Sequence, residues 1–192
     1  MADIVIIQGH PDSAHPHFCH ALAEAYRKGA EAAGHGVTLL DVGATNVVPL
    51  RDPTEWKAGG GPDYAAEAQR AITAAKHVVL IYPLWMGTMP AHLKAWLERV
   101  FTEEFAFDIT AKGWTPKLKG RSARVVVTMG MPAFFYRYFF FAHSLKSLRR
   151  NILGFAGFGP IRDSLVGTVE AEDPSGRQKW LDRMEGYGRR AA

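Results

Sequence analysis

The sequence predicts a doubly wound α/β fold, with a five-stranded parallel sheet in the order 2-1-3-4-5 and helices on both faces. β-Branched runs of strand length alternate with helical stripes of apolar residues over the whole chain of 192 residues. Glycine and proline mark many of the boundaries between these segments. Right-handed crossovers between parallel strands place helices on alternate sides of a sheet. Five strands suit the 2-1-3-4-5 order better than the six-stranded dinucleotide-binding order.

The composition predicts one globular domain over residues 1–192. Hydrophobic residues make up 47% of the chain and charged residues 22%, which excludes an intrinsically disordered protein. The 19 glycines and 11 prolines show no period, which excludes collagen-like material. The formal net charge of +4 is too small to indicate nucleic-acid binding, so no nucleic-acid partner is expected.

Cysteine usage and the apolar segments favour a cytoplasmic protein. The sequence has 1 cysteine, Cys19, which excludes an intrachain disulfide and a cysteine-rich zinc site. No basic leader precedes the first apolar run. The longest uncharged stretch, residues 78–91, is short for a membrane span and contains Pro83 and Gly87. We therefore expect a cytoplasmic location without membrane insertion.

The N-terminal segment has the pattern of a strand, a helix and a second strand. Residues 4–7 form an apolar run that is typical of a buried parallel strand. Residues 16–33 begin with a proline, which suits a first helical turn, and continue with apolar residues at helical spacing. Glycines within residues 34–36 end this helix before a strand over residues 37–42.

The rest of the chain repeats this alternation. Residues 43–62, which include Trp56 and a triple glycine, have no period and predict a long surface loop. The following segments predict a helix over 63–75, a strand over 78–82, a helix over 90–101, a strand over 123–128, a helix over 143–153, a strand over 161–169 and a helix over 174–187. The predicted total is five strands and five helices.

Three turns follow the carboxyl ends of predicted strands, where ligands bind in open α/β sheets. They span residues 9–13, 83–88 and 128–132 and are rich in glycine and proline. We expect them to converge at one edge of the sheet. There they would offer closely approaching backbone, apolar walls that include Trp85, and free N–H groups at helix starts. This combination suits a flat, partly polar ring with a phosphate tail.

Other kinds of site lack their motifs. The segment with His10, His15, His17 and His20 has no HExxH pattern and no paired cysteines, so no metal site is expected. The chain has no GxxxxGK[ST] and no GxSxG motif, and its Gly-x-Gly precedes a predicted strand instead of following one. Cys19 has no identifiable catalytic partners, so we expect a packed or cofactor-lining thiol.

An aromatic run covers residues 134–141. It is too aromatic for an ordinary exposed loop and too short to span a bilayer. The run could line a binding site, cover a dimer interface or belong to the core, and these three interpretations overlap.

Several blocks of the sequence carry a family resemblance. They are residues 6–11 with residues 18–22, then residues 82–101, and finally residues 127–130, and the block over 82–101 is the most specific. Together they resemble the flavodoxin-like NAD(P)H:quinone oxidoreductases, which include DT-diaphorase-type and bacterial NAD(P)H dehydrogenase (quinone) proteins. The resemblance covers most of the chain and implies a flavodoxin-like fold.

This resemblance implies a homodimer with one FAD per subunit near the dimer interface, FMN being the alternative flavin. NAD(P)H would reduce the flavin, and a quinone-like acceptor would reoxidise it in the same pocket by a ping-pong mechanism. Tyr136 resembles the family's active-site tyrosine, and His143 is the nearest imidazole to the position of an assisting histidine. The implied flavin contacts are His10, Ser13, His15, His17, Phe18 and Cys19 at the phosphate, Pro83, Leu84, Trp85, Met86 and Gly87 along the ring, and Thr128, Met129 and Gly130 at its pyrimidine side.

Some residues depart from the family pattern. Residues 85–87 are Trp-Met-Gly where mammalian-type members have Gln-Trp-Phe, Met131 replaces a second glycine, and Tyr138 stands near the place of the assisting histidine. Asp12 would repel phosphate unless it caps the helix or turns outward, so the predicted site leaves it out.

Two other functions are compatible with the resemblance. One is a regulatory flavoprotein that acts as an accessory subunit of a potassium efflux system, and the other is a flavodoxin-type electron carrier. The net charge of +4 argues against the carrier, because such carriers are usually acidic. A redox titration separates a one-electron carrier from a two-electron enzyme.

Overall fold

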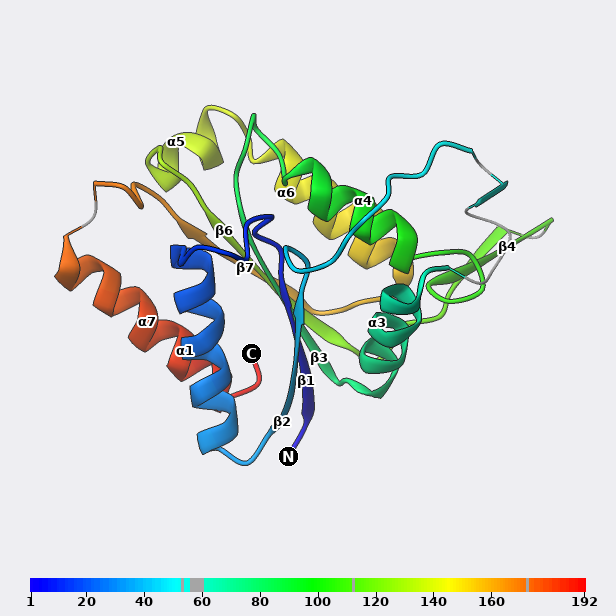
Figure 1. Cartoon of the computed structure of the whole chain (residues 1–192), viewed down its shortest axis with the longest axis horizontal. Helices are drawn as coiled ribbons and strands as arrows, with labels where there is room; N and C mark the ends of the chain where they lie inside the picture. The colour runs from blue at the N-terminus through cyan, green and yellow to red at the C-terminus, as the bar shows by residue number, and fades with distance from the viewer. Residues whose placement is uncertain (53, 56–60, 112, 172) are drawn as a thin grey trace.

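The main sheet of the computed structural model has parallel strands in the order β2-β1-β3-β6-β7 (Figure 1). The structure describes residues 1–52, 54–55, 61–111, 113–171 and 173–192. The strands are β1 (Asp3–Gln8), β2 (Gly36–Asp41), β3 (His77–Pro83), β6 (Ser122–Thr128) and β7 (Ile161–Val166). Numbered along the chain within this sheet, the order is 2-1-3-4-5, which confirms the predicted fold.

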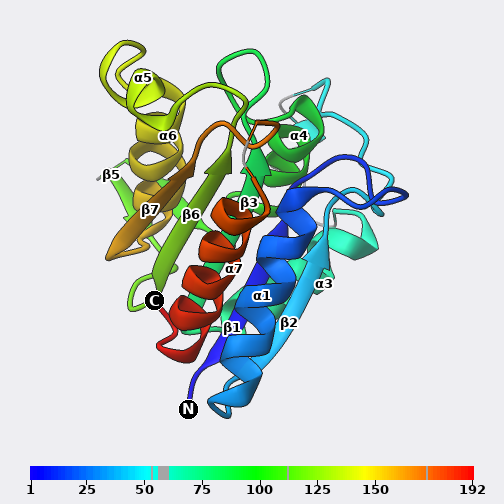
Figure 2. The same ribbon diagram turned by 90° about the vertical axis from the view of Figure 1, so that its left-hand side faces the viewer.

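Helices cover both faces of the sheet, as the sequence predicted (Figures 1 and 2). One face carries α1 (Phe18–Ala32) and α7 (Pro174–Arg189), and the other carries α3 (Asp63–Ala74), α4 (Ala91–Val100), α6 (His143–Ser147) and the π-helical segment η1 (Leu148–Gly154). In the described parts of the chain, no helix has both the length and the apolar character needed to cross a lipid bilayer.

Alternate residues of the central strands supply two separate apolar cores. In β1, Ile4 and Ile6 pack in the core under α1 and α7, whereas Val5 and Ile7 pack in the core under α3 and α4. Successive side chains of a strand point to opposite faces, which produces this division. Because both faces are buried, the strands have the continuous apolar runs that identified them in the sequence.

Two glycines allow α1 and α7 to pack backbone against backbone. A Cβ atom on Gly29 would lie 2.0 Å from the carbonyl oxygen of Glu185, and one on Gly188 would lie 2.1 Å from the carbonyl oxygen of Tyr26. Both distances are much shorter than a nonbonded contact, so neither position accepts a side chain unless a helix moves.

Three elements were not predicted from the sequence, namely the two strands of a hairpin and one short helix. β4 (Phe107–Thr110) and β5 (Gly113–Pro116) form an antiparallel hairpin outside the main sheet. α5 (Ala133–Tyr138) forms from part of the aromatic run. The hairpin strands have 4 residues each, which is too short for a recognisable period. The predicted total of five strands and five helices is therefore too low.

Two predicted elements differ from the structure by more than two residues at one end or in the type of helix. The last strand ends at Val166 instead of residue 169, because the chain at Gly167 turns against the segment after β6: a Cβ atom there would lie 2.4 Å from the Ala133 amide nitrogen. The helix predicted over 143–153 changes at Leu148 from α-helical to π-helical hydrogen bonding. In the predicted loop over 43–62, Trp56 and the first two glycines of the triple glycine lie outside the described residues.

Candidate functional site

The turns that follow β1, β3 and β6 meet at the carboxyl edge of the sheet, as predicted. The Leu84 amide donates to the Thr128 carbonyl at 2.7 Å, which ties the β3 turn to the end of β6. The His10 imidazole lies edge-on to the Trp85 indole, with 5.7 Å between ring centroids. The Cys19 thiol, at the start of α1, lies 3.2 Å from the Thr128 hydroxyl. The strand order reverses between β1 and β3, so the turns meet at the topological switch point of the sheet.

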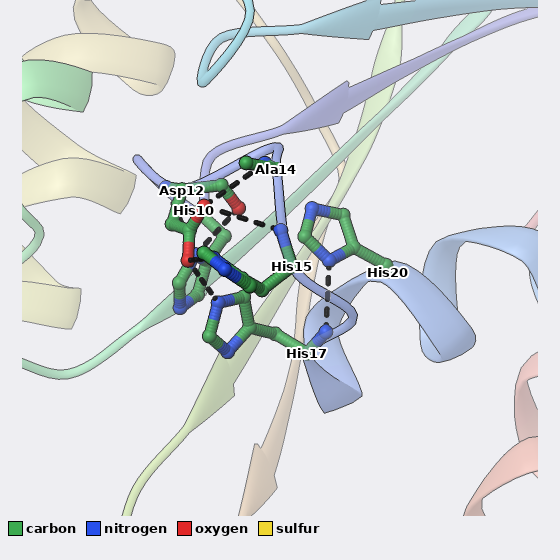
Figure 3. A network of polar contacts seen from close by, with 6 residues as sticks. All are labelled: His10, Asp12, Ala14, His15, His17 and His20. Carbon is green, nitrogen blue, oxygen red and sulfur yellow. Dashed lines mark hydrogen bonds and ion pairs between the residues drawn. The ribbon is translucent and has the colours of Figure 1, made fainter.

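A loop rich in histidine connects β1 to α1 (Figure 3). The His10 ring stacks on the His17 ring, with 3.7 Å between centroids and 20° between planes. One oxygen of Asp12 lies 2.9 Å from Nδ1 of His15 and 2.9 Å from Nε2 of His17. The His17 amide donates to Nδ1 of His20 at 3.0 Å, which satisfies a donor at the start of α1. The loop is therefore held by contacts among its own side chains.

Burial and hydrogen bonding favour the neutral form of His10 and His20 and the charged form of Asp12. Burial lowers the pKa of His10, and the nearby His17 lowers it further. Burial also lowers the pKa of His20, so both rings are neutral near pH 7. Hydrogen bonds from His17 and His15 hold the pKa of Asp12 well below its usual range, and the group stays a carboxylate. Among the described residues, no cluster of three or more His, Cys, Asp or Glu side chains has a geometry that could hold a metal ion.

Two buried polar nitrogen atoms near this loop have no hydrogen-bond partner among the described residues. Within the described structure, Nε2 of Gln8 and Nε2 of His20 are buried without a hydrogen-bond partner. The guanidinium of Arg177, from α7, lies 5.7 Å from the ring centroid of Phe18, the first residue of α1. Ser13 is exposed in the same loop. Unused donors and a cation beside a helix start are the groups that an anionic phosphate satisfies.

A tight turn after β3 presents an aromatic surface. Trp85 and Thr88 exchange backbone hydrogen bonds of 2.8 and 3.0 Å. Between them, Met86 and Gly87 have φ values of 46° and 80°, which a two-residue turn of this hand requires. The turn leaves Trp85 48% exposed and Met86 fully exposed, whereas residues 83–84 are buried or partly buried. Residues 85–87 are thus among the exposed residues of the turn, and residues 83–84 lie beneath them.

The exposed surface at the end of β6 is main chain rather than side chain. Thr128 and Met129 are buried, and the Met129 amide donates to the Val166 carbonyl at 2.8 Å. Gly130 is exposed, and a Cβ atom added to it would meet only the Glu170 carboxylate, at 3.8 Å. The Met129 side chain belongs to the core, so the open surface here is the backbone of Gly130.

Cys19 is a packed thiol, in line with the expectation from the sequence. It is 2% exposed, and its burial raises the pKa of the thiol to about 12. The thiol therefore stays protonated and is not a nucleophile at neutral pH.

Tyr136 lies in the core and not in the open part of the site. It is 2% exposed, its hydroxyl lies 2.7 Å from the Ser144 hydroxyl, and it accepts a hydrogen bond from the Leu145 amide at 3.2 Å. Residues 141–142 have φ values of 53° and 47°, and this left-handed pair folds α6 back toward α5. His143 begins α6 and is exposed. The catalytic roles of Tyr136 and His143 stay predictions.

The aromatic run divides between the core and the surface. Tyr136 is buried, while the other aromatic side chains are between 39% and 72% exposed. The exposed ones are Phe134, Phe135, Tyr138, Phe139, Phe140 and Phe141. The rings of Phe135 and Phe139 stack with 4.6 Å between centroids. The core interpretation therefore holds for Tyr136, and the exposed rings fit a site wall or a dimer interface.

A cleft of about 450 Å³ opens beside the Trp85 turn. Trp85, Met86 and Met89 line one side, and Ser144 and Leu148 line the other, so its walls are mainly apolar. A larger cleft of about 560 Å³ lies between α4 and η1 and contains none of the predicted site residues. The smaller cleft is the one that adjoins the candidate site.

The family of the chain follows from a comparison with models of known families. Residues 2–187 match the family described as flavodoxin-like fold. The chain belongs to this flavodoxin-like family. The matched residues include the whole main sheet and every turn of the candidate site.

Curated relatives of this flavodoxin-like chain include oxidoreductases. It is 26% identical to an uncharacterized NAD(P)H oxidoreductase of Haemophilus influenzae, over 93% of this chain and 90% of that protein. It is 35% identical to a ribosyldihydronicotinamide dehydrogenase [quinone] of Mus musculus, over 62% of this chain and 55% of that protein. The chain thus matches only about half the length of the mouse protein.

Solved structures share the fold. An NAD(P)H:quinone oxidoreductase of Methanothermobacter marburgensis has a TM-score of 0.82 at 24% identity and covers 98% of this chain and 96% of its own. An FMN-dependent NADH-azoreductase of Bacillus anthracis in complex with FMN has a TM-score of 0.77 at 18% identity, with 98% of each chain covered. At these identities the likeness shows the fold.

Two contacts in this region were not predicted from the sequence. Asp12 was left out of the site, although histidines three and five positions later are the spacing that lets one carboxylate contact both rings. Ser144 was not identified as the partner of Tyr136. No local pattern marks that pair, because it depends on the backbone reversal between α5 and α6.

Proposed function

We propose that residues 1–192 act as a single flavin-binding domain that catalyses two-electron transfer from NAD(P)H to a quinone-like acceptor. The observation that carries the proposal is the meeting of three turns at the switch point of the sheet, where His10 contacts Trp85 and Cys19 contacts Thr128. The relatives support it: the Haemophilus protein is named an NAD(P)H oxidoreductase, and the mouse and Methanothermobacter proteins are named for quinone reactions.

The side chains of the site fit a flavin. The helix start at Phe18 and the unused Nε2 groups of Gln8 and His20 suit its phosphate, and Trp85 offers a half-exposed ring on which a flat ligand can stack. A bound flavin would supply the chemistry of two-electron hydride transfer between NAD(P)H and the acceptor. The residues that would hold it are His10, Ser13, His15, His17, Phe18 and Cys19 at the phosphate, Pro83, Leu84, Trp85, Met86 and Gly87 along the ring, and Thr128, Met129 and Gly130 at the pyrimidine end.

Each turn of the protein has a separate task in this proposal. The loop over residues 10–19 binds the anionic end of the ligand, and the turn over residues 85–87 fixes the plane of its ring. Backbone N–H groups near Gly130 stabilise negative charge on the pyrimidine end. The apolar cleft beside Trp85 admits a flat molecule and excludes water. One such opening would serve donor and acceptor in turn, which gives ping-pong kinetics.

FAD is the proposed flavin, and FMN is the alternative, since the similar Bacillus anthracis structure holds FMN. The identity of the flavin released on denaturation decides between them. A homodimer is proposed as the assembly, with the exposed aromatic side chains of residues 134–141 as its candidate interface. The reducing cytoplasm is the proposed compartment, because the one cysteine is unpaired.

Purified protein is expected to be yellow or to take up added flavin, and then to oxidise NAD(P)H only when a quinone is supplied. Absorbance of the flavin and of NAD(P)H measures both steps. Protein that remains colourless and quenches no flavin fluorescence would overturn the proposal.

The variant Tyr136→Phe tests the catalytic prediction for this residue. The change removes the hydroxyl that contacts Ser144 and the Leu145 amide, so α6 loses a fixed position. Turnover with a quinone is expected to fall roughly tenfold, because misplaced groups slow catalysis more than they weaken binding. Flavin affinity should change little. The control is Tyr138→Phe, whose hydroxyl is on a 72% exposed side chain of the same helix. Loss of flavin without slower turnover of the loaded enzyme would contradict the prediction.

A further inference from the structure

A pair of hydroxyl groups connects the core to the cleft beside Trp85. The Tyr136 hydroxyl, on a buried side chain, lies 2.7 Å from the Ser144 hydroxyl. Ser144, on α6, is partly buried and lines the cleft of about 450 Å³ that Trp85 also lines. Tyr136 does not line this cleft. Ser144 is therefore the member of the pair that a molecule in the cleft can contact.

The hydrogen bonds of Tyr136 indicate which hydroxyl donates to the other. The phenolic oxygen accepts a hydrogen bond from the Leu145 amide at 3.2 Å. A phenol has one hydrogen to donate, and among the described residues the Ser144 oxygen is the only acceptor bonded to it. The Tyr82 hydroxyl, in the same core, has no hydrogen-bond partner in the described structure, so it does not take this hydrogen. Because an unpaired donor in the core is costly, Tyr136 donates to Ser144.

Ser144 therefore accepts with its oxygen and keeps its own hydrogen for another partner. In the parts of the chain that the structure describes, the contact with Tyr136 is the one hydrogen bond of the Ser144 side chain. The fixed lone pair on the oxygen directs the remaining hydrogen away from Tyr136. The cleft thus has a hydroxyl donor whose orientation is set from within the core.

The other polar side chains that line the cleft are not held in this way. The Lys94 ammonium group forms an ion pair with the Glu98 carboxylate. Thr88 and Ser147 line the cleft as well, but both residues are exposed, so water competes for their hydroxyl groups. Ser144 is therefore the donor of the cleft with the best-defined direction.

We propose that Ser144 is a specificity-determining residue that donates a hydrogen bond to a carbonyl oxygen of the acceptor, and that Tyr136 is a positioning residue that orients its hydroxyl. This proposal rests on the proposed function, because the acceptor enters the cleft beside Trp85. The apolar walls accept any flat molecule, whereas this donor selects a molecule with an oxygen acceptor.

The same hydrogen bond favours reduction of the acceptor. A quinone gains a hydride and a proton when it is reduced, and negative charge develops on its oxygen atoms as the hydride arrives. A donor already aimed at such an oxygen stabilises this charge. Ser144 keeps its hydrogen throughout, and water supplies the proton that completes the product.

The variant Ser144→Ala tests the proposal with two ligands of the same shape. Menadione is a methylated naphthoquinone, and methylnaphthalene has the same rings and methyl group without the oxygen atoms. Their dissociation constants are measured on the flavin-loaded protein without NAD(P)H, by quenching of tryptophan fluorescence. Loss of one neutral hydrogen bond is expected to weaken menadione binding about fivefold. Methylnaphthalene binding should not change.

A double variant tests whether Tyr136 acts through Ser144. Turnover with menadione is expected to fall roughly tenfold in Ser144→Ala, as in Tyr136→Phe, because the same donor is lost or misdirected. The variant with both changes should turn over menadione as fast as Ser144→Ala alone. Independent effects would instead multiply to a loss of about a hundredfold, and that result would overturn the positioning role of Tyr136.

Matched measurements separate the possible failures. Ser147→Ala removes the other hydroxyl of α6 and should weaken menadione binding by less than about twofold, since that hydroxyl exchanges hydrogen bonds with water. Thermal unfolding checks that Ser144→Ala is folded. Equal weakening of both ligands, unchanged menadione binding, or an equal loss in Ser147→Ala would overturn the role of Ser144 alone. Flavin-loaded unaltered protein that does not reduce menadione with NAD(P)H would instead overturn the proposed function.

Discussion

Replacing Gly130 with valine is expected to weaken flavin binding about a hundredfold while leaving the fold intact. A Cβ atom at this position meets only the Glu170 carboxylate at 3.8 Å, and the backbone of Gly130 is not left-handed, so the protein itself accommodates a side chain. The new side chain would occupy the place proposed for the pyrimidine end of the ring. Overpacking costs up to about 3 kcal/mol, which corresponds to a factor of roughly 100 in a dissociation constant.

Flavin fluorescence titration and thermal unfolding measure the two parts of this result. Gly61→Val is the matched control, since a Cβ atom on Gly61 makes an ordinary contact of 3.5 Å with the Ala65 side chain. Gly61 lies in none of the three turns that form the candidate site, so its variant should bind flavin with unchanged affinity. Normal flavin affinity in Gly130→Val would show that the ring does not lie against the end of β6.

Replacing Gly188 with alanine is expected to lower the free energy of unfolding by about 3 kcal/mol, near the upper end of overpacking costs. The added methyl group would lie 2.1 Å from the Tyr26 carbonyl oxygen, and this neighbour is backbone that cannot rotate away. One helix must therefore shift away from the other. For a chain of this size, the melting temperature should drop by roughly 6–12 °C.

Gly186→Ala is the control for this stability effect, because it lies on the same helix. There the added methyl group would meet only the end of the flexible Arg190 side chain, at 3.6 Å. Alanine is more favourable than glycine in a helix by about 1 kcal/mol, so this variant should have a slightly higher melting temperature than the unaltered protein. Equal melting temperatures for Gly186→Ala and Gly188→Ala would mean that α1 and α7 do not cross as closely as described.

The sheet and most helices could be predicted because their local patterns agree with their burial. The strands β1, β3 and β6 are covered on both faces, so each shows an unbroken apolar run in the sequence. The hairpin β4–β5 is short and lies outside the main sheet, and α5 is a helix of 6 mostly aromatic residues, so neither has a period to recognise. Their formation depends on neighbours that are distant in the sequence.

The site could be predicted in position but not in detail. Topology places the ends of parallel strands together, which was enough to bring His10 beside Trp85. The direction of a side chain is not set by topology. The backbone reversal at residues 141–142 brings Ser144 and Leu145 to the Tyr136 hydroxyl, and Asp12 turns toward His17 rather than outward. These orientations depend on single φ angles and on hydrogen bonds within a loop.

The pairing of α1 with α7 has a consequence for the order of events during synthesis. The helix α1 is made well before α7, which covers the same side of the sheet. At about 5–20 residues per second, roughly 8–30 s pass on the ribosome before residues 174–189 emerge. During that interval α7 does not yet cover Ile4, Ile6 and their neighbours. The nascent chain therefore exposes an apolar surface that a chaperone can bind.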